Sequence, residues 1–580
     1  MRDSSFRASR RLSAALGLAI LAACPIDASG QLAIGLGGPL GDTGRAIAVD
    51  ASGNIAVTGS FNGTVDFDPG PGLLELTAGG SEAVFVASFD PAGALRFARA
   101  FPGDGYGIAV DSAGNVYVTG EIQGAPVDVD PGPDSVLLDP QQGRAFLVSY
   151  DGTGALRFGL NFGGGLSNRV ERGTAIAVDE NDHVYLTGII NGDTDFDGPG
   201  GELPVPLNGL TDGFVASYST NGGYRFGFAV GSTLADAGYG IAARGNECCV
   251  TGAFRGTVDF DPAAEIETRT SNGNLDLFVA RYSSTGALLS VAAVGGPFDD
   301  IGYALALDAA GNVFATGEFR DTVDFDPGPG QSLVTSAGNR DLFLASYTAA
   351  GDLRFAFGLG NTNDMVGLGL AVDVGGEPWI TGRFTGTVDF DPGPGDASIT
   401  GNQEAFVAGY SGAGTFRLAH RFPDVGSLDS DSGEGIALDV GGSVHVVGTF
   451  AGTNDFDPGP ASLELTSNGA SDVFFLRETA TAVAVGEVPA SREDSRLGPI
   501  APNPSGGDTR LEWTARASGP VRVTLHDVTG RRLAVLWSGV LAAGERKALS
   551  LSGSGLASGS YFVRVEDRGG VSSGNFVVVR

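Results

Sequence analysis

The sequence repeats itself, and this periodicity constrains the fold more than any other feature. A strand-like segment that ends in glycine recurs seven times along the first 450 residues. The copies are Asn54–Gly59, Asn115–Gly120, His183–Gly188, Glu247–Gly252, Asn312–Gly317, Glu377–Gly382 and Ser443–Gly448. Their terminal glycines are 61 to 68 residues apart. A repeat of nearly fixed length indicates a chain built from copies of one supersecondary unit.

Each copy contains four short apolar segments. In the second copy these are Gly107–Asp111, Val116–Thr119, Phe146–Tyr150 and Leu156–Leu160. The segments are rich in β-branched and aromatic residues and are bounded by Gly, Asp and Asn, a pattern typical of strands and tight turns. Four short strands per repeat are the unit of a β-propeller blade. The sequence therefore predicts an all-β, seven-bladed β-propeller of four-stranded blades.

The last copy predicts how the ring closes. Six copies have a fourth strand, but the seventh ends at its third strand, Val473–Leu476. The segment Gln31–Gly37 is apolar and has no other place in the repeat. We expect it to become the outermost strand of the last blade, which would join the two ends of the ring and remove exposed strand edges.

Composition limits the fold class and the partners. The chain of 580 residues contains 94 glycines, which disfavours helices because glycine costs about 1 kcal/mol per helix-interior position. The formal net charge is −33. Nucleic acid and anionic membranes require clustered Lys and Arg, so neither is expected as a partner. A chain with this excess of carboxylates is expected to attract cations.

The first thirty residues have the pattern of a secretory signal peptide. Arginines precede an apolar stretch from Leu12 to Ala23, and small residues precede Gln31. The apolar stretch is too short to span a bilayer, and no later segment is apolar enough to do so. We expect an exported chain that is cleaved near Gln31. The alternative is a lipoprotein, because Leu21-Ala22-Ala23 precedes Cys24.

Four segments follow from these observations. Residues 1–30 are the expected signal peptide and residues 31–477 the propeller. Residues 478–500 form a polar, alanine-rich linker. Residues 501–580 carry six predicted strands, which suit a small C-terminal Ig-like β-sandwich. From Leu497 onward the chain has ten Lys and Arg against six Asp and Glu, so the acidity belongs to the propeller.

An Asp-x-Asp pair occurs between the second and third strands of every copy. The pairs are Asp66/Asp68, Asp128/Asp130, Asp195/Asp197, Asp259/Asp261, Asp324/Asp326, Asp389/Asp391 and Asp455/Asp457. Alternating carboxylates with loop carbonyls suit Ca²⁺, which takes six to eight oxygen ligands. The alternative is turn formation, since Asp caps tight turns and Pro-Gly sets their dihedral angles. We favour the turn interpretation and retain calcium as the candidate cofactor.

More acidic residues fall on the same side of the predicted ring. The connections between successive blades contribute Asp42, Asp104, Asp236, Asp300, Asp364 and Asp431. These connections and the Asp-x-Asp loops lie on one face of an up-and-down blade. The sequence therefore predicts a strongly negative rim.

The copies resemble the beta-propeller repeat family of bacterial surface proteins. The resemblance rests on Gly107–Gly120 (GIAVDSAGNVYVTG) and on segments such as Phe85–Leu95 (FVASFDPAGAL). It covers nearly all of residues 31–480. It implies the propeller fold but no single activity and no catalytic set.

The tail resembles the type A C-terminal sorting domain of type IX secretion, which is related to hook-cap-like Ig domains. The motif residues are Pro502, Asn503, Pro504, Asp527, Gly530, Arg531, Gly559 and Tyr561. The resemblance implies recognition by the secretion machinery and passage across the outer membrane, followed by release or attachment at the cell surface. The alternative is a plain accessory sandwich.

No motif of a known catalytic centre is present in the sequence. The four histidines occupy different repeat positions, and Cys248 and Cys249 are predicted as strand residues on opposite faces. We therefore expect a secreted or surface-bound propeller that binds glycan or protein. Two alternatives stay open: an enzyme acting on extracellular polysaccharide, for which paired carboxylates would serve, and a structural scaffold of the envelope.

Overall fold

The structure is a computed structural model that describes residues 31–79, 82–164, 170–198, 204–263, 265–424, 430–459, 462–478, 508–514, 519–527, 532–542, 545–552, 559–567 and 570–578. Every regular element in these ranges is a β-strand, so the predicted all-β class is confirmed. Within the same ranges no helix is long and apolar enough to cross a membrane. The chain divides into two compact units, Met1–Val488 and Pro489–Arg580.

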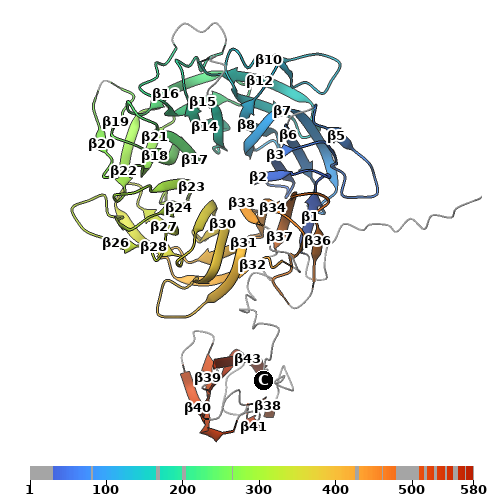
Figure 1. Ribbon diagram of the computed structural model, residues 1–580, viewed down its shortest axis with the longest axis vertical. Helices are drawn as coiled ribbons and strands as arrows, with labels where there is room; N and C mark the ends of the chain where they lie inside the picture. Colours follow the sequence, from blue (N-terminus) through green and yellow to red (C-terminus); the bar gives the residue numbers. More distant parts are fainter. Residues whose placement is uncertain are drawn as a thin grey trace, which may run out of the picture. The chain divides into compact units, whose positions relative to one another are not determined.

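In the first unit, consecutive strands pair antiparallel in groups of four, arranged around a common centre (Figure 1). The first three groups are β2 (Thr43–Val49), β3 (Ile55–Phe61), β6 (Ala83–Phe89) and the start of β7 (Leu95–Val110); the end of β7, β8 (Val116–Ile122), β11 (Ala145–Tyr150) and β12 (Leu156–Phe162); and β13 (Arg172–Val178), β14 (His183–Ile190), β15 (Asp212–Ser219) and β16 (Tyr224–Val230). The long strand β7 joins the first two groups into one seven-stranded sheet.

The next three groups repeat this order. They are β17 (Ala237–Arg244), β18 (Glu247–Phe254), β21 (Asp276–Ser283) and β22 (Leu288–Val294); β23 (Ile301–Leu307), β24 (Val313–Phe319), β27 (Asp341–Tyr347) and β28 (Leu353–Leu359); and β29 (Met365–Val372), β30 (Pro378–Asp389), β31 (Ser398–Tyr410) and β32 (Phe416–Arg421). Each sequence repeat therefore corresponds to one group of four strands.

The last group contains strands from both ends of the first unit. It consists of β33 (Ser432–Leu438), β34 (Val444–Phe450), β37 (Asp472–Glu478) and β1 (Leu32–Leu36). Strand β1 pairs antiparallel with β37, and Leu36 lies opposite Val473. The N-terminal segment thus occupies the outer position that β7, β12 and β16 hold in their groups.

A short hairpin extends the connection between the second and third strands of most repeats. These hairpins are β4 (Thr64–Asp66) with β5 (Glu75–Thr77), β9 (Val127–Asp128) with β10 (Leu137–Leu138), β19 (Thr257–Asp259) with β20 (Thr268–Thr270), β25 (Thr322–Asp324) with β26 (Leu333–Thr335), and β35 (Thr453–Asp455) with β36 (Glu464–Thr466). In the sixth repeat β30 and β31 are long enough to include the hairpin. Sequence analysis gave this connection no strands.

The first strand of each repeat lies nearest the centre, where adjacent repeats touch at the backbone (Figure 1). A Cβ added to Gly107 would lie 3.1 Å from the Cα of Ala175, and one added to Gly240 would lie 2.8 Å from the carbonyl oxygen of Tyr303. Every repeat has Ala or Gly at this position: Ala46, Gly107, Ala175, Gly240, Ala304, Gly369 and Gly435. Crowding at the axis therefore explains part of the glycine excess.

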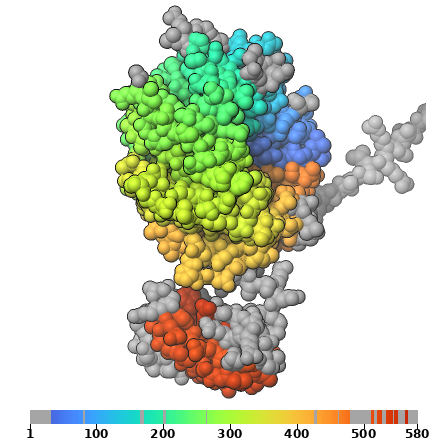
Figure 2. Space-filling model, turned by 60° about the vertical axis from the view of Figure 1, so that its left-hand side comes forward, coloured from blue at the N-terminus to red at the C-terminus, as the bar shows by residue number. Residues whose placement is uncertain are grey.

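The cores lie between adjacent sheets. Phe314 and Leu344 of the fifth repeat pack in one cluster with Ile380 and Phe406 of the sixth, and all four side chains are fully buried. Each sheet is covered on both faces by its neighbours, so its strands are apolar throughout rather than alternating. The space-filling view shows the successive repeats packed directly against one another (Figure 2).

The second unit contains two sheets. They are β38 (Asp508–Thr514) with β41 (Arg546–Ser552), and β40 (Arg532–Leu541), β39 (Gly519–Asp527), β42 (Gly559–Asp567) and β43 (Gly570–Val578). Leu511 and Trp513 of the first sheet share one buried cluster with Val523 and Val563 of the second. The described part of this unit thus contains six strands, the number predicted for residues 501–580.

Candidate functional site

The first aspartate of each Asp-x-Asp pair folds the loop that follows it. In all seven copies its carboxylate accepts a hydrogen bond from the backbone N–H of the second Asp, over 3.0–3.2 Å. In six copies the same oxygen also accepts from the N–H eight residues on. These first aspartates are Asp66, Asp128, Asp195, Asp259, Asp324, Asp389 and Asp455.

The second aspartate of the pair closes a turn of its own in six copies. Its Oδ1 atom accepts from the N–H two residues on, over 2.6–2.8 Å. The six residues are Asp68, Asp130, Asp261, Asp326, Asp391 and Asp457, and all are partly buried. The third copy differs: Asp197 is exposed, and its backbone N–H donates to Asp195 at 3.2 Å.

The residue between the two aspartates anchors the loop in the core. Phe260, Phe325 and Phe390 are buried at this position. In five copies its backbone carbonyl accepts a hydrogen bond from a buried tyrosine at the end of the third strand. The pairs are Tyr150–Val129, Tyr218–Phe196, Tyr282–Phe260, Tyr347–Phe325 and Tyr410–Phe390. The motif is therefore an apolar plug, aromatic in most copies, flanked by two turn-forming carboxylates.

These contacts match the turn interpretation of the motif. Pro-Gly-Pro-Gly follows several pairs, and the second glycine is required by close approach, because a Cβ on Gly330 would lie 2.1 Å from Asp326 Oδ2.

The same carboxylates are the predicted calcium ligands. Sequence analysis offered both aspartates of each pair as ligands, which requires the pair to meet further oxygen donors around one ion. In the described ranges no group of three or more His, Cys, Asp or Glu side chains is placed to hold a metal ion. The structure therefore does not gather the second aspartates, Asp68, Asp130, Asp197, Asp261, Asp326, Asp391 and Asp457, with their first aspartates into a carboxylate cage. Calcium binding at the pairs stays a prediction.

The predicted negative rim needs correction, because most of the connection aspartates are buried. Asp42, Asp104, Asp236, Asp300 and Asp431 are at most 7% exposed. Four of them cap backbone N–H groups: Asp300, for example, accepts from Gly296 and Arg320 at 2.7 and 2.9 Å. The fifth, Asp104, accepts from the Gln123 side chain at 3.2 Å. Burial raises the pKa of Asp300 to about 7, which disfavours its charged form. These residues clamp loops together and do not form an exposed acidic surface.

A different set of side chains lies on the first strands, which are the strands nearest the centre of the ring (Figure 1). Each first strand contains a β-bulge at the same position, after the glycine that recurs there in every repeat. The bulged residues are all partly buried: Arg45, Tyr106, Thr174, Tyr239, Tyr303, Leu368 and Glu434. We call these seven residues, together with Arg172, the axial mouth. Bulges commonly re-aim a side chain next to a functional site.

One half of the axial mouth is a tyrosine between two arginines. The guanidinium carbons of Arg45 and Arg172 lie 4.8 and 4.9 Å from the centre of the Tyr106 ring. Arg172 also donates a 3.3 Å hydrogen bond to the Tyr106 hydroxyl. Burial raises the pKa of Tyr106, while the two arginines lower it. Three consecutive repeats thus contribute one residue each to this stack.

The other half contains two further tyrosines. The rings of Tyr239 and Tyr303 are 5.5 Å apart with an interplanar angle of 57°. The buried carboxylate of Glu318 lies close enough to both to raise their pKa, in addition to the larger effect of burial. Arg340 forms ion pairs with Glu318 and Asp364. This side of the mouth is therefore aromatic, with its charges largely paired.

The opposite end of the first strands lines a hollow of about 310 Å³. Its walls come from Ile241–Arg244, Leu305–Leu307 and Leu370–Val372, with Ala177. This end has aliphatic residues and Arg244 but no aromatic side chain in its lining, unlike the axial mouth.

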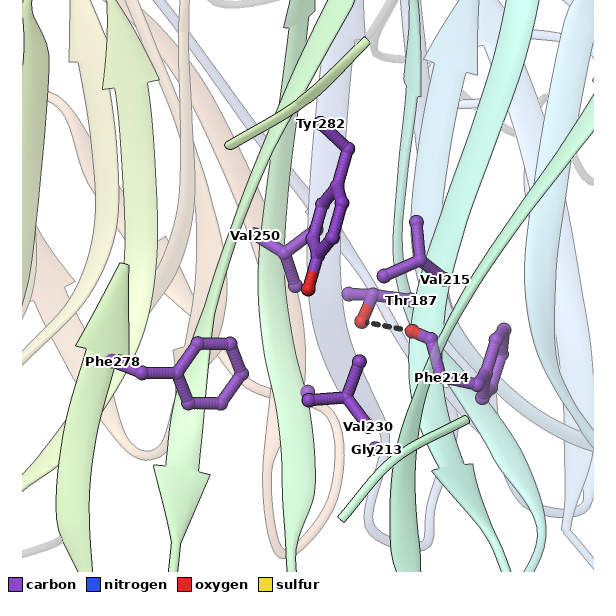
Figure 3. A pocket seen from close by; sticks show the side chains of 9 residues that line it. Thr187, Gly213, Phe214, Val215, Val230, Val250, Phe278 and Tyr282 are labelled. Carbon is purple, nitrogen blue, oxygen red and sulfur yellow. Dashed lines mark hydrogen bonds between the residues drawn. The ribbon is translucent and has the colours of Figure 1, made fainter. Parts of the chain in front are cut away.

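A second gap lies between the third and fourth sheets, where Val215 and Val230 face Val250 and Tyr282 (Figure 3). Its polar groups are already satisfied. Thr187 donates to the carbonyl of Phe214, and Tyr282 donates to that of Phe260. It is an interior packing gap and offers no group to a ligand.

The histidines and cysteines lie apart from the axial mouth. His183, His420 and His445 face Asp179, Glu478 and Asp439 respectively. Cys248 and Cys249 are free, buried and members of two different clusters, as expected for neighbours on opposite faces of β18. Trp379 packs between the sixth and seventh sheets.

The predicted sorting residues are described only in part. Asp527 ends β39, Gly559 begins β42, and the Tyr561 side chain is buried in the core of the second unit. The other five, Pro502, Asn503, Pro504, Gly530 and Arg531, lie outside the described residues, as do residues 1–30 with the predicted signal peptide.

Sequence analysis missed the axial mouth. The sequence does contain a signal. Each first strand has the pattern Gly-x-Ala or Gly-x-Gly, and the residue x differs between repeats, being Arg, Tyr, Thr, Leu or Glu. A scaffold repeats its residues, whereas a ligand site on a ring departs from the ring's symmetry.

Comparison with known proteins agrees with this architecture. The beta-propeller repeat family matches residues 101–126, which contain the end of one repeat and the start of the next. This match and the repeated four-stranded groups support a β-propeller repeat architecture. The chain is also 23% identical over 497 residues to an uncharacterized WD repeat-containing protein of Acanthamoeba polyphaga mimivirus. That match covers 70% of this chain but only 35% of the relative. β-Propeller repeats indicate a binding or scaffold role.

Proposed function

We propose that this chain is an exported, seven-bladed β-propeller that binds an extracellular ligand at its axial mouth. The observation that carries the proposal is the asymmetry of the bulge positions. The turns, the core and the Thr-Gly strand ends are nearly the same in every repeat, but the bulged residues differ in size, charge and aromaticity. Partly exposed Tyr and Arg side chains are the residue types that dominate recognition surfaces.

Binding is favoured over catalysis because the carboxylates of the Asp-x-Asp pairs already accept hydrogen bonds within the protein. An acid–base pair for polysaccharide cleavage requires carboxyl groups directed at a substrate. Here the Asp-x-Asp carboxylates accept backbone N–H bonds within their own loops. No observation favours the enzyme alternative over binding.

The second unit would act in delivery. We propose that it is an Ig-like sandwich that the type IX secretion machinery recognises, so that the propeller is released or displayed at the cell surface. The two sheets around a shared core and the buried Tyr561 support this proposal. Deleting residues 501–580 should retain the propeller inside the outer membrane, as measured by cell fractionation. Surface display of the truncated chain would contradict the delivery role.

Ligand binding is tested on a glycan array with the full chain and two tyrosine variants. Tyr303→Ala removes one ring of the axial mouth, and Tyr224→Ala removes a ring that is 44% exposed on the outer strand β16. We expect Tyr303→Ala to lose the bound glycans and Tyr224→Ala to keep them. Equal binding by all three proteins would exclude the axial mouth as the site.

A further inference from the structure

The arrangement of Arg45 and Arg172 around Tyr106 leaves much of their hydrogen-bonding capacity unused. In the described part of the chain, Arg45 has its stacking contact with Tyr106 and no hydrogen-bond or ion-pair partner. Arg172 has the Tyr106 hydroxyl as its one polar partner there. The Nε atoms of both arginines are buried without a hydrogen-bond partner among the described residues. Each guanidinium group carries five N–H donors in a planar fork that matches a carboxylate.

A second Arg–Tyr stack in the same molecule shows what a purely structural pair does. The guanidinium of Arg157 lies 5.5 Å from the Tyr117 ring centre and donates to the Tyr117 hydroxyl and to Ser149 Oγ, at 2.7 and 2.9 Å. Its donors are used within its own repeat. The guanidinium groups of Arg45 and Arg172 stack on Tyr106, and the 3.3 Å bond from Arg172 to the Tyr106 hydroxyl is the one hydrogen bond that the two form within the described residues.

The carboxyl groups near this stack have partners of their own. Glu121 is paired with Arg144 at 3.3 Å and accepts from Gln123. Glu82 accepts a 2.5 Å hydrogen bond from Ser60 Oγ, and burial raises its pKa, with a further contribution from Asp104. Burial raises the pKa of Glu121 as well, so both acids ionise less readily than an exposed carboxyl group.

The tyrosines on the other side of the mouth supply apolar surface. Arg172 lies on β13, and Tyr239 lies on β17, the first strand of the next repeat, which contacts β13. Arg172 also lowers the pKa of both Tyr106 and Tyr239.

We propose that the axial mouth binds the carboxylate of a uronic acid residue, with Arg45 and Arg172 on the carboxylate and Tyr239 and Tyr303 against the sugar ring. The assignment rests on the proposed function and names its ligand class. A chain-end uronic acid fits better than a polyanion, because a protein with a net charge of −33 repels a long anionic chain. Nucleic acid is disfavoured for the same reason.

The experiment titrates the full chain with D-glucuronate, D-glucose and acetate, using ligand-detected NMR. We expect glucuronate to bind at least tenfold more tightly than glucose, which lacks the carboxylate, and than acetate, which lacks the ring. Arg45→Gln and Arg172→Gln should each weaken glucuronate binding at least tenfold. Arg157→Gln is the matched control and should leave it unchanged. Thermal melts of every variant establish that the fold is retained.

Equal affinity for glucose and glucuronate, or glucuronate binding that survives both Arg45→Gln and Arg172→Gln, would overturn the carboxylate assignment. The proposed function can fail separately. If Tyr303→Ala abolishes binding of neutral array glycans while glucuronate does not bind, the mouth is the site and the assignment is wrong. If no bound ligand responds to any mouth substitution, both proposals are wrong.

Discussion

The hydroxyl of Tyr347 donates a hydrogen bond to the backbone carbonyl of Phe325, over 3.2 Å. Tyr347 ends the third strand of the fifth repeat, and Phe325 lies between the two aspartates of its loop. Both side chains are at most 1% exposed. This bond ties the most regular acidic motif of the chain to the core, and four other repeats have the same bond.

Tyr347→Phe should destabilise the propeller by about 1–3 kcal/mol, because a buried carbonyl loses its hydrogen-bond donor. Tyr224→Phe is the control, since that residue is 44% exposed. Urea unfolding measures both. Equal midpoints for Tyr347→Phe and the unchanged protein would show that the Phe325 carbonyl does not depend on this donor.

Substitutions at Asp324 distinguish turn formation from calcium binding. The Asp324 Oδ1 atom accepts from the N–H groups of Asp326 and Ser332, and an asparagine oxygen can accept the same bonds. We expect Asp324→Asn to melt close to the unchanged protein and Asp324→Ala to lose about 1 kcal/mol or more. Calcium and chelator should not shift the melting temperature. A chelator-induced fall that Asp324→Asn removes would show that calcium binds at the pair.

Removing strand β1 should open the ring. Deletion of residues 31–36 takes away the partner of β37 and exposes a long apolar edge. We expect a clearly lower melting temperature, measured by circular dichroism. Gly35→Ala is the control, since an added Cβ there meets only ordinary contacts at 3.6 Å. An unchanged melt after the deletion would mean that β1 does not close the ring.

Burial of Asp276 predicts that stability falls as the pH rises. Desolvation raises its pKa from 3.8 to about 6 in the folded protein. Between these two values the folded state binds more protons than the unfolded state, so the stabilisation is complete below pH 3.8 and is lost as the pH rises through 6. Because of Asp276, the free energy of unfolding should be about 1–3 kcal/mol lower above pH 6 than near pH 3.8.

Asp276→Asn removes this titration and should reduce the slope of the unfolding free energy against pH between about pH 4 and 7.5, while other buried carboxyl groups such as that of Asp300 still contribute. Asp396→Asn is the control, because the pKa of that exposed carboxyl is lowered by hydrogen bonds from Ser398 and it titrates below this range. A profile that keeps its full slope in Asp276→Asn would assign the pH dependence to other groups.

The repeat units were predictable from the sequence because local rules fix them. The predicted segments Val116–Thr119, Phe146–Tyr150 and Leu156–Leu160 lie within β8, β11 and β12. Alternating turn residues and β-branched segments are short-range signals. The Asp-x-Asp loops were also located, and turn formation was the favoured interpretation.

Two features depend on tertiary context and were not predicted correctly. Aspartate is usually exposed, so the sequence gives no sign that Asp300 and Asp431 are buried. They are buried because neighbouring loops bring backbone N–H groups against them. Arg45, Tyr106 and Tyr303 lie within strand-like segments, and the β-bulge that sets them apart is seen only in the paired strands. Neither a loop path nor a bulge leaves a short-range signal in one repeat.

A diffraction structure of the full chain with a glycan selected on the array would locate the ligand. We expect glycan density at the axial mouth, in contact with Tyr106, Tyr239 and Tyr303. Density over the Asp-x-Asp loops or on the second unit, with the axial mouth unoccupied, would contradict it.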